Sequence, residues 1–530
     1  MVRWLAVAGL ALVAACAVGL AIGVDRLWWF AAAPLVALSV IGVYDLLQRS
    51  HSVLRNYPVI GHARFLLERI RPEIQQYFVE RNTDGTPYDR EIRDLVYDRA
   101  KGNHGEEPFG TQRDVNAVGY EFVAHSLRAK PKPDGVVPTV RLGGPECTKP
   151  YDIALLNISA MSFGSLSAQA VEALNGGAAL GGFAHDTGEG SITIHHSKYG
   201  GDLIWEIGSA YFGCRTADGE FDPEPYVQRA TLEQVKAVSL KLSQGAKPGL
   251  GGLLPGAKVN EEVSRARGVP IGTTIVSPPT HTAFDTPRGL IEFVARLRDL
   301  SGGKPVGFKL CIGSRREFLA ICKAMVELDS TPDFIIVDGS EGGTGAGPVE
   351  FEDYVGMPLT EGLMFVHNAL VGCGMRERVR IGASGKIASG IDIVKRICQG
   401  ADFTLAARAM MFAVGCIQAQ ACHTNHCPVG VATQDPWRAR ALVVDDKRHR
   451  VHQYQEKTVN SAMQIVASMG LDSFGDLTPR KLFRRVDPQV TQTYYDLFQW
   501  LEPGELLIEP PEGWRRDWAT ASPQTFEPKL

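Results

Sequence analysis

Two long stretches without charged residues open the chain and predict membrane-spanning helices. Residues 4–24 hold 21 uncharged positions and residues 27–44 hold 18, with Asp25 and Arg26 between them. A helix over the first stretch would rise about 30 Å, which matches the hydrocarbon core of a bilayer. The pattern therefore predicts a two-helix transmembrane hairpin over residues 1–48.

The residues around this hairpin predict its orientation. Trp28 and Trp29 favour the membrane interface, and arginines lie at both outer ends. These arginines are Arg3, Arg49, Arg55, Arg64, Arg69 and Arg71. Because basic residues stay inside, we expect the hairpin in the cell inner (cytoplasmic) membrane, with the catalytic domain on the cytoplasmic side. Two alternatives stay open: a cleaved secretory signal, since VAAC (13–16) resembles a lipoprotein cleavage box, and a buried helix pair in a soluble protein.

Residues 49–140 have the character of a polar, helix-rich collar. FLLERIRPEIQQYF (65–78) places apolar residues three and four apart, which is typical of a helix. Pro72 must either begin a new helix there or kink this one. KPKPDGVVP (130–138) combines three prolines with a glycine and marks a linker.

From residue 141 to residue 440, short apolar runs alternate with stretches of helical periodicity. The runs are IALLNISAM, GTTIVSPP, PVGFKLCIG, DFIIVDGS, RVRIGASG and ADFTLAARAM. Apolar strands joined by helices indicate a parallel sheet covered on both faces, and about 280 residues suit a closed barrel of eight strands. We therefore predict an α/β protein with a TIM (β/α)8 barrel and helical flanking segments, including a C-terminal helical extension over residues 441–530.

Two glycine-rich loops follow late strands of this barrel and predict a phosphate site. The run DFIIVDGSEGGTGAGP leads from an apolar strand into Asp338, followed by bare backbone amides that suit an anion. Its glycines include Gly342, Gly343 and Gly345.

The next unit, RIGASGKIASG, repeats this arrangement. We expect Gly382 and Gly385 to follow the strand, just ahead of a helix that starts near Gly390 and whose amino end attracts anions. Because the chain lacks a Walker lysine and the GxGxxG spacing, the pattern favours a mononucleotide. Ordinary turn glycines are the alternative.

The run GCIQAQACHTNHCPVG concentrates three cysteines in one loop. Cys416, Cys422 and Cys427 are too widely spaced for a zinc knuckle. Three thiolates match the ligands of a 3Fe-4S cluster, or of a 4Fe-4S cluster with one open iron. Two alternatives stay open: a zinc site completed by His423 or His426, and a group of buried thiols.

Composition narrows the classes of function. With 45% hydrophobic and 22% charged residues among 530, the chain is an ordinary folded protein. A net charge of -4 with mixed signs offers no basic face, so no nucleic-acid partner is expected. The seven cysteines outside the loop are interpreted as packing thiols, since ten in all are too sparse for a disulfide scaffold.

Six motifs, taken in order, resemble the FMN-binding domain of glutamate synthases. They are MSFGSLS (161–167), DTGEGS (186–191), SQGAKPGLGGLLPGAKV (243–259), SPPTH (277–281), GSEGGTGAGP (339–348) and CIQAQACHTNHCPVGVATQDP (416–436). The resemblance covers residues 90–440 and is strongest to the short, stand-alone FMN-binding members of this family. It implies FMN and a 3Fe-4S cluster held by the three cysteines, with electrons passing from a donor through the cluster to FMN.

The resemblance also implies a reaction, that of an oxidoreductase acting on CH-NH2 groups. Reduced flavin would give a hydride to 2-iminoglutarate, formed from 2-oxoglutarate and ammonia, and glutamate would result. Lys241 and Lys247 resemble the lysine pair that holds carboxylates near the flavin, and Glu189 is a carboxylate suited to handle a proton.

Further residues correspond to the flavin site of the family. Met161, Ser162 and Ser165 resemble the loop at the flavin face. Lys309 is placed to stabilise the anionic N1–C2 edge of reduced flavin. His281 is interpreted as a turn residue.

Three positions depart from the family patterns KPGEGGQLPG and GRFG. Leu250 and Leu253 replace a glutamate and a glutamine, and Tyr211 replaces an arginine for which Arg215 could substitute. A pocket for 2-oxoglutarate would lose those polar contacts. The alternatives are therefore a related FMN and iron-sulfur oxidoreductase for another oxo acid and amine (N-methylglutamate synthase-like, or an oxo- or hydroxy-acid dehydrogenase) and an electron-transfer subunit.

The sequence also bears on partners. It shows no amino-terminal cysteine nucleophile of a glutaminase, so we expect ammonia from solution or from another subunit. It shows no dinucleotide fingerprint, so the electron donor is expected to be separate, either ferredoxin or an NAD(P)H-dependent reductase subunit.

Overall fold

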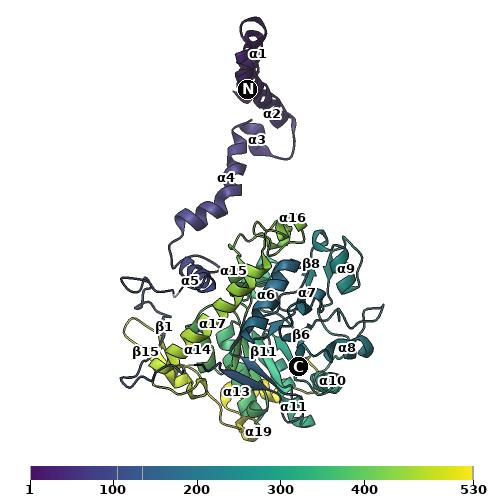
Figure 1. Cartoon of the computed structure of the whole chain (residues 1–530), viewed down its shortest axis with the longest axis vertical. Coiled ribbons are helices and arrows are strands. Elements are labelled where there is room, and N and C mark those ends of the chain that lie inside the picture. The colour runs from purple at the N-terminus through teal and green to yellow at the C-terminus, as the bar shows by residue number, and fades with distance from the viewer. Residues whose placement is uncertain (1, 104, 134, 528–530) are drawn as a thin grey trace. The chain divides into compact units, whose positions relative to one another are not determined.

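The computed structural model describes residues 2–103, 105–133 and 135–527. The chain forms two compact units, Met1–Arg90 and Glu91–Leu530. Figure 1 traces it by colour from the purple N-terminus to the yellow C-terminus.

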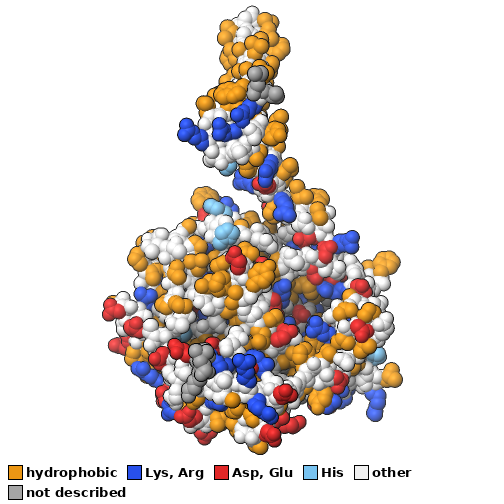
Figure 2. All heavy atoms as spheres, turned by 180° about the vertical axis from the view of Figure 1, so that it is seen from behind, with side chains coloured by type: hydrophobic (Ala, Val, Ile, Leu, Met, Phe, Trp, Pro, Cys, Tyr) orange, Lys and Arg blue, Asp and Glu red, His pale blue; other side chains and the backbone are white. Residues whose placement is uncertain are grey.

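The first unit begins with two apolar helices, α1 (Val2–Gly23) and α2 (Trp29–Leu47), joined through the 3-10 turn η1 (Arg26–Trp28). The two helices pack against each other, and hydrophobic side chains cover the face seen in Figure 2. Each is long and apolar enough to cross a bilayer. The helical hairpin is confirmed, whereas its insertion into a membrane stays a prediction, because signal sequences and buried helices share this length and composition.

A shorter helical arm follows in the same unit. It consists of α3 (Ser52–Asn56), α4 (Gly61–Ile74) and the π turn η2 (Gln75–Val79). Pro72 lies inside α4, so no new helix begins there, and the winding changes three residues later. The buried carboxylate of Asp45 accepts the Val59 N–H at 2.8 Å and pairs with His62 at 2.9 Å, which fastens the arm to α2.

Eight parallel strands of the second unit close into a barrel, which confirms the predicted TIM (β/α)8 fold. They are β4 (Leu156–Ile158), β5 (His185–Asp186), β6 (Leu203–Ile207), β7 (Val235–Lys241), β10 (Val306–Leu310), β11 (Phe334–Asp338), β12 (Arg380–Ser384) and β13 (Phe403–Ala406). Pairing of β13 with β4 completes the circle. Nearly all residues of these strands are buried, as expected for a sheet covered by helices.

Five of the six apolar runs contain barrel strands, and the prediction for GTTIVSPP is wrong. Its strand β9 (Ile275–Val276) pairs antiparallel with β8 (Leu253–Leu254) outside the barrel. The sequence did not predict β5, β6 or β7. Strand β5 has only two residues. Strand β6 reads LIWEI and β7 reads VKAVSLK, so charged residues interrupt their apolar pattern.

Helices alternate with the strands and surround the barrel (Figure 1). The longer ones are α6 (Ala168–Gly181), α8 (Pro223–Ala230), α10 (Pro287–Leu300), α11 (Arg315–Leu328), α13 (Leu359–Gly372) and α14 (Gly390–Cys398). Shorter elements are α7 (Ile194–Ser197), η3 (Gly256–Lys258), α9 (Glu261–Arg267), α12 (Val349–Tyr354), η4 (Arg376–Arg378), α15 (Arg408–Val414), η5 (Cys422–Thr424) and α16 (Pro436–Ala439). Side-chain caps begin several of them, such as Thr286, whose hydroxyl accepts the Gly289 N–H at the start of α10.

Segments on either side of the barrel in sequence pack onto it. The long helix α17 (Val444–Ser468) lies against α6 and α14. Strand β1 (Glu121–Val123) pairs with β14 (Leu482–Arg485), so the segment before the barrel and the C-terminal segment form one small sheet. The remaining elements are α5 (Arg90–Ala100), η6 (Phe474–Asp476), η7 (Pro479–Lys481), β15 (Thr491–Thr493), α18 (Tyr494–Leu497), α19 (Glu505–Ile508) and α20 (Glu512–Thr520). The domain limits at residues 48, 140 and 440 stay predictions.

The hairpin of β2 (Thr139–Leu142) and β3 (Tyr151–Ala154) covers the end of the barrel where the strands begin. Leu142 and Ile153 are fully buried in a core that includes Ile204, Phe334 and Phe403. The opposite end, where the strands finish, is where barrels of this type carry out chemistry.

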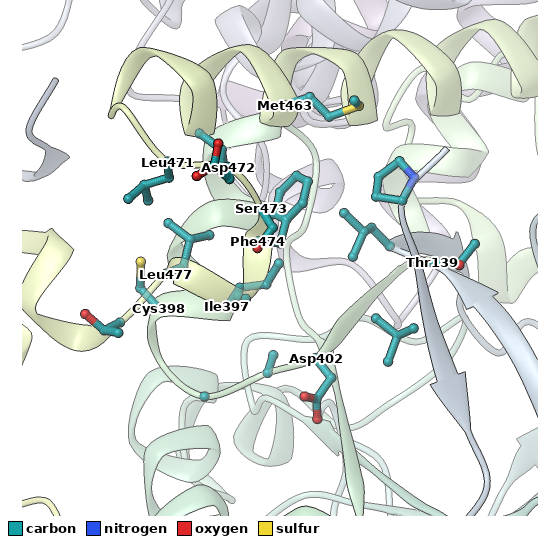
Figure 3. A pocket seen from close by; sticks show the side chains of 18 of the residues that line it. Thr139, Ile397, Cys398, Asp402, Met463, Leu471, Asp472, Ser473, Phe474 and Leu477 are labelled. Atoms are coloured by element: carbon teal, nitrogen blue, oxygen red, sulfur yellow. The ribbon is translucent and has the colours of Figure 1, made fainter. Parts of the chain in front are cut away.

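A cavity of about 600 Å³ lies beside the end where the strands begin (Figure 3). Its walls come from β2, α14, α17 and residues just ahead of β13. Its charged groups are already partnered, since Arg376 pairs with Asp402 at 2.9 Å. None of the predicted site residues lines this cavity, so it is distinct from the site at the strand ends.

Candidate active site

A largely buried ion pair marks the end of the barrel where the strands finish. Lys241 closes β7 and Glu189 follows β5, and the lysine Nζ lies 3.0 Å from the glutamate Oε1. The lysine also donates to the side chain of Gln244 at 2.7 Å. Burial alone would raise the pKa of Glu189, but Lys241, with smaller effects of Arg267 and Lys309, holds the pKa below its usual value. Glu189 is therefore ionised at neutral pH.

The loop after β7 is fixed against the loop after β11. The Asp338 carboxylate accepts the Gly245 N–H at 2.7 Å, and Lys247 donates from Nζ to the Ala346 carbonyl at 3.0 Å. A side chain at residue 245 would not fit, since its Cβ would lie 1.8 Å from the Gly339 oxygen. Burial, followed by the charge of Lys241, lowers the pKa of Lys247 to about 8. The two predicted site lysines thus lie at the end of β7 and in the loop that follows it, and hydrogen bonds join this loop to the one after β11.

Lys309 has a carboxylate partner that the sequence did not predict. Its ammonium forms a buried ion pair with Glu206 of β6. Burial would lower the pKa of Lys309, but Glu206 and then Asp186 raise it above its ordinary value. No sequence signal links these residues, because they come from three separate strands.

The predicted flavin-face loop is held by a buried arginine from α9. Arg267 donates to the Ser162 hydroxyl at 3.2 Å and to the Phe163 carbonyl at 2.9 Å, and Ser162 lies 3.2 Å from Ser165. Burial lowers the pKa of Arg267 to about 10, so the guanidinium stays charged at neutral pH. Met161 is buried in the same loop. Arg267 was not found from the sequence because EEVSRAR resembles any surface helix.

The glycines of the predicted phosphate loops lie in different structural environments. Gly385 follows β12 with φ 150°, ahead of α14, which begins at Gly390 as predicted. The placement of Gly382 after the strand is wrong, because it lies inside β12, where a Cβ would come within 2.7 Å of the Phe403 ring.

In the loop after β11, Gly343 and Gly345 are exposed and Gly342 is partly buried. A Cβ at Gly343 would meet the guanidinium of Arg408 at 2.8 Å, and Arg408 donates to the Glu341 carbonyl. Arg408 begins α15, after the eighth strand, and brings a cation to this loop that the sequence analysis missed.

The three loop cysteines line one small cavity. Burial raises the pKa of Cys416 to about 12, and Cys427 is buried. Among the described residues, no group of three or more Cys, His, Asp or Glu is arranged to hold a metal ion. His423 and His426 are exposed and are not among the residues that line the cavity.

A buried lysine accompanies these thiols. Lys258 is 2% exposed, and the charges of Cys422 and Cys427 act on its pKa, which burial lowers to about 8. Its Nζ donates to the Ser165 carbonyl at 2.8 Å. Lys258 thus joins the cysteine loop to the flavin-face loop, although no motif singled it out in the sequence.

Two further contacts connect these loops. Ser167 donates from its hydroxyl to the Gly430 carbonyl at 2.7 Å, and the Gln434 amide donates to the Leu166 carbonyl at 2.6 Å. Residues more than 260 positions apart are therefore fixed side by side.

The interpretation of His281 as a turn residue is incomplete. His281 is buried, with one ring nitrogen 2.8 Å from the Lys241 carbonyl and the other 3.1 Å from the Tyr211 hydroxyl. Burial lowers its pKa to about 4, so it is neutral. Tyr211 is fully buried in this contact and cannot replace the family's arginine, whereas Leu250 and Leu253 are each 39% exposed.

Comparison with known proteins gives one consistent family. Residues 142–472 match the conserved region in glutamate synthase. A glutamate synthase large subunit-like protein, YerD, of Bacillus subtilis (strain 168) is 38% identical over 485 residues, which span 83% of this chain and 91% of that protein.

Other relatives are longer than the shared region. An archaeal glutamate synthase [NADPH] of Archaeoglobus fulgidus is 34% identical over 60% of this chain and 59% of its own length. A ferredoxin-dependent glutamate synthase 1 of Arabidopsis thaliana is 32% identical over 53% of this chain but only 17% of its own length.

Solved structures give a weaker likeness. A lactate oxidase of Pediococcus acidilactici has a TM-score of 0.42 and 13% identity, covering 78% of this chain and 93% of its own. A mandelate oxidase has a TM-score of 0.41 and 17% identity, covering 76% and 96%. Likeness at this level adds nothing to the barrel that the strand pairing already shows.

Proposed function

Because the chain belongs to the glutamate synthase family, we propose that it is a flavin oxidoreductase that makes glutamate by reductive amination of 2-oxoglutarate with ammonia, through 2-iminoglutarate. The observation that carries this proposal is the joining of two sites. Glu189, which pairs with Lys241, lies in a loop packed against the one with Ser162, since a Cβ at Gly188 would come 2.6 Å from the Ser162 nitrogen. Lys258 links the Ser162 loop to the cysteine loop.

The residues at the strand ends fit FMN. Exposed glycine amides, the left-handed Gly385 ahead of α14 and the nearby guanidinium of Arg408 suit a phosphate. Lys309 and the loop at Met161 would hold the ring system. When bound, FMN would supply hydride transfer.

An iron-sulfur cluster at the cysteine loop is proposed from its three thiols, although these thiols are not arranged as a metal site among the described residues. Three thiols share one cavity, and the buried ammonium of Lys258 would offset the negative charge of thiolate ligands. The cavity's lining supports a 3Fe-4S cluster over zinc, since neither His423 nor His426 takes part in it. The electrons would come from a separate ferredoxin or NAD(P)H-dependent reductase.

The chain's own residues can perform the remaining steps. Lys247 keeps much of its charge at neutral pH and would bind a substrate carboxylate. Lys241 would polarise the oxo group, and its pairing keeps Glu189 ionised and able to accept a proton. The fixed loop after β7 would orient the substrate, because Gly245 and Asp338 allow it little movement.

A second substrate class is favoured by one observation. Leu250 and Leu253 expose apolar surface close to the site, since Gly252 between them would place a Cβ 2.2 Å from Glu189. A less polar amine, as in an N-methylglutamate synthase-like enzyme, or a less polar oxo acid, as in an oxo- or hydroxy-acid dehydrogenase, would suit these side chains.

We further propose that the apolar hairpin anchors the barrel to the cytoplasmic face of the inner membrane.

The test is a reoxidation assay without oxygen. The flavin of the full chain in detergent is photoreduced, and 2-oxoglutarate with ammonium is added while absorbance is followed. Rapid return of the oxidised spectrum is expected. If a less polar amine or a less polar oxo acid reoxidises the flavin and 2-oxoglutarate with ammonium does not, the second substrate class is correct, and if no oxo acid acts, the chain is an electron-transfer subunit.

A further inference from the structure

Three ionisable residues form a layer inside the barrel above its apolar core. Glu206 lies two positions after the core residue Ile204 of β6, and Asp186, the last residue of β5, lies two positions after the core residue Ala184, which directly precedes that strand. Because side chains of a strand alternate between faces, both acids point into the barrel. The third member of the layer is Lys309, and all three residues are 5% exposed or less.

The charges in this layer do not balance. Glu206 forms the ion pair with Lys309, which leaves Asp186 without a cation of its own. Lys241 also acts on Asp186, but its direct partner is Glu189. Asp338, on the neighbouring strand, adds another acid near Lys309. An unmatched buried carboxylate is costly, so neutralisation by a proton is the cheaper state.

The hydrogen bonds of Asp186 agree with one retained proton. Its Oδ1 accepts the Gly188 N–H at 3.0 Å, whereas its Oδ2 is buried and has no hydrogen-bond partner. A protonated Oδ2 would be a donor directed toward the barrel interior. Burial, followed by the charge of Glu206, raises the pKa of Asp186 to about 8.

We propose that Asp186 stays protonated at neutral pH, with Glu206 and Lys309 as its neighbouring ion pair, and serves as a neutral hydrogen-bond donor beneath the group bound at the barrel mouth. Asp186 is then a positioning residue that limits negative charge next to a reduced flavin. The role of Asp186 next to the flavin is the second part of the proposal and rests on the proposed function. The first part, the retained proton on Asp186, does not depend on that function.

Infrared spectroscopy tests the proton without any cofactor. The full chain in detergent is prepared with aspartate labelled with ¹³C at its side-chain carboxyl, and the band of a protonated carboxylic acid is recorded at neutral pH. We expect an isotope-shifted band that disappears above its pKa of about 8. Asp186→Asn should remove it. Glu206→Gln should also remove it, because Asp186 would then ionise as the partner of Lys309.

The matched control is Glu172→Gln. Glu172 is a buried acid outside the barrel interior, already paired with His195 at 2.8 Å and Lys198 at 2.7 Å, so its variant should keep the aspartate band. The absence of a protonated aspartate band in the unmodified chain, or its persistence in Asp186→Asn, would overturn the proposal.

The flavin midpoint potential tests the second part. As pH rises past 8, ionisation of Asp186 should lower the potential more steeply in the unmodified chain than in Asp186→Asn, which cannot ionise. Equal slopes of midpoint potential against pH in the two proteins would contradict the proposed role of Asp186 toward the flavin. If no flavin binds, the proposed function fails. The infrared measurement still shows whether Asp186 is protonated at neutral pH.

Discussion

The buried pair of Lys241 and Glu189 allows a quantitative prediction. Lys241→Met removes the ammonium and leaves a carboxylate whose side chain is only 15% exposed. Breaking one side of a buried ion pair costs about 3–5 kcal/mol, because the remaining charge has no partner. We therefore expect the free energy of unfolding at neutral pH to fall by about that amount.

The pH dependence of this loss has a defined sign. In the unmodified chain the pKa of Glu189 is lowered, so the pair's contribution is present above the unfolded pKa and is lost as pH falls through the folded pKa. In Lys241→Met the effect of Lys241 is gone, and burial, the largest cause acting on Glu189, is opposed only by the smaller effects of Arg267 and Lys309, so we expect the pKa of Glu189 to lie above its usual value. The folded variant then binds more protons than the unfolded chain, and its deficit should shrink as pH falls from neutral.

The assay is denaturant unfolding of the full chain in detergent across pH. The double variant Lys241→Met with Glu189→Gln should recover most of the stability, since no unpaired charge remains. Lys236→Met is the control, because Lys236 pairs with Asp202 at 3.6 Å near the surface and should cost less than about 1 kcal/mol. If the single and double variants are equally unstable, or if the deficit does not change with pH, the reasoning about Glu189 is refuted.

Three further predictions concern the loops. Gly245→Ala should displace the loop that carries Lys247 and reduce substrate affinity more than tenfold, measured as KM, because its Cβ would meet the Gly339 oxygen at 1.8 Å. Binding of a dicarboxylate should weaken as pH rises through about 8, where Lys247 loses its charge; affinity that is constant to well above this pH would contradict the assigned role. Cys422→Ser should lose bound iron whereas Cys398→Ser, at a buried thiol elsewhere, should keep it, and metal analysis distinguishes them.

The barrel could be predicted where strands are apolar along their whole length. FIIVD of β11 and FTLA of β13 show this plainly. LIWEI of β6 was missed because a glutamate in a short apolar run is typical of a surface position. Its buried partner, Lys309, lies on a strand about 100 residues later and cannot be read from the pattern around Glu206. The prediction of a barrel strand in GTTIVSPP was wrong because this run has the composition of a strand, yet only two of its residues pair, and they pair outside the barrel.

The site residues divide in the same way into those that a motif locates and those that no motif locates. Lys241, Glu189 and the three cysteines lie in motifs, so a resemblance could locate them. Lys258 and Arg267 lie in short helical segments without a motif, and their importance follows only from burial and from carbonyl and hydroxyl partners distant in sequence. Sequence patterns report periodicity along one segment and cannot report which segments meet.

Cofactor analysis of the full chain, purified without oxygen, tests the central proposal most directly. Released flavin, iron and acid-labile sulfide are measured on one sample, together with its electron paramagnetic resonance spectrum. We predict FMN equimolar with the chain, and iron and sulfide in the ratio of a 3Fe-4S cluster with its spectrum. A colourless preparation that contains zinc in place of iron and no flavin would contradict the proposed redox function.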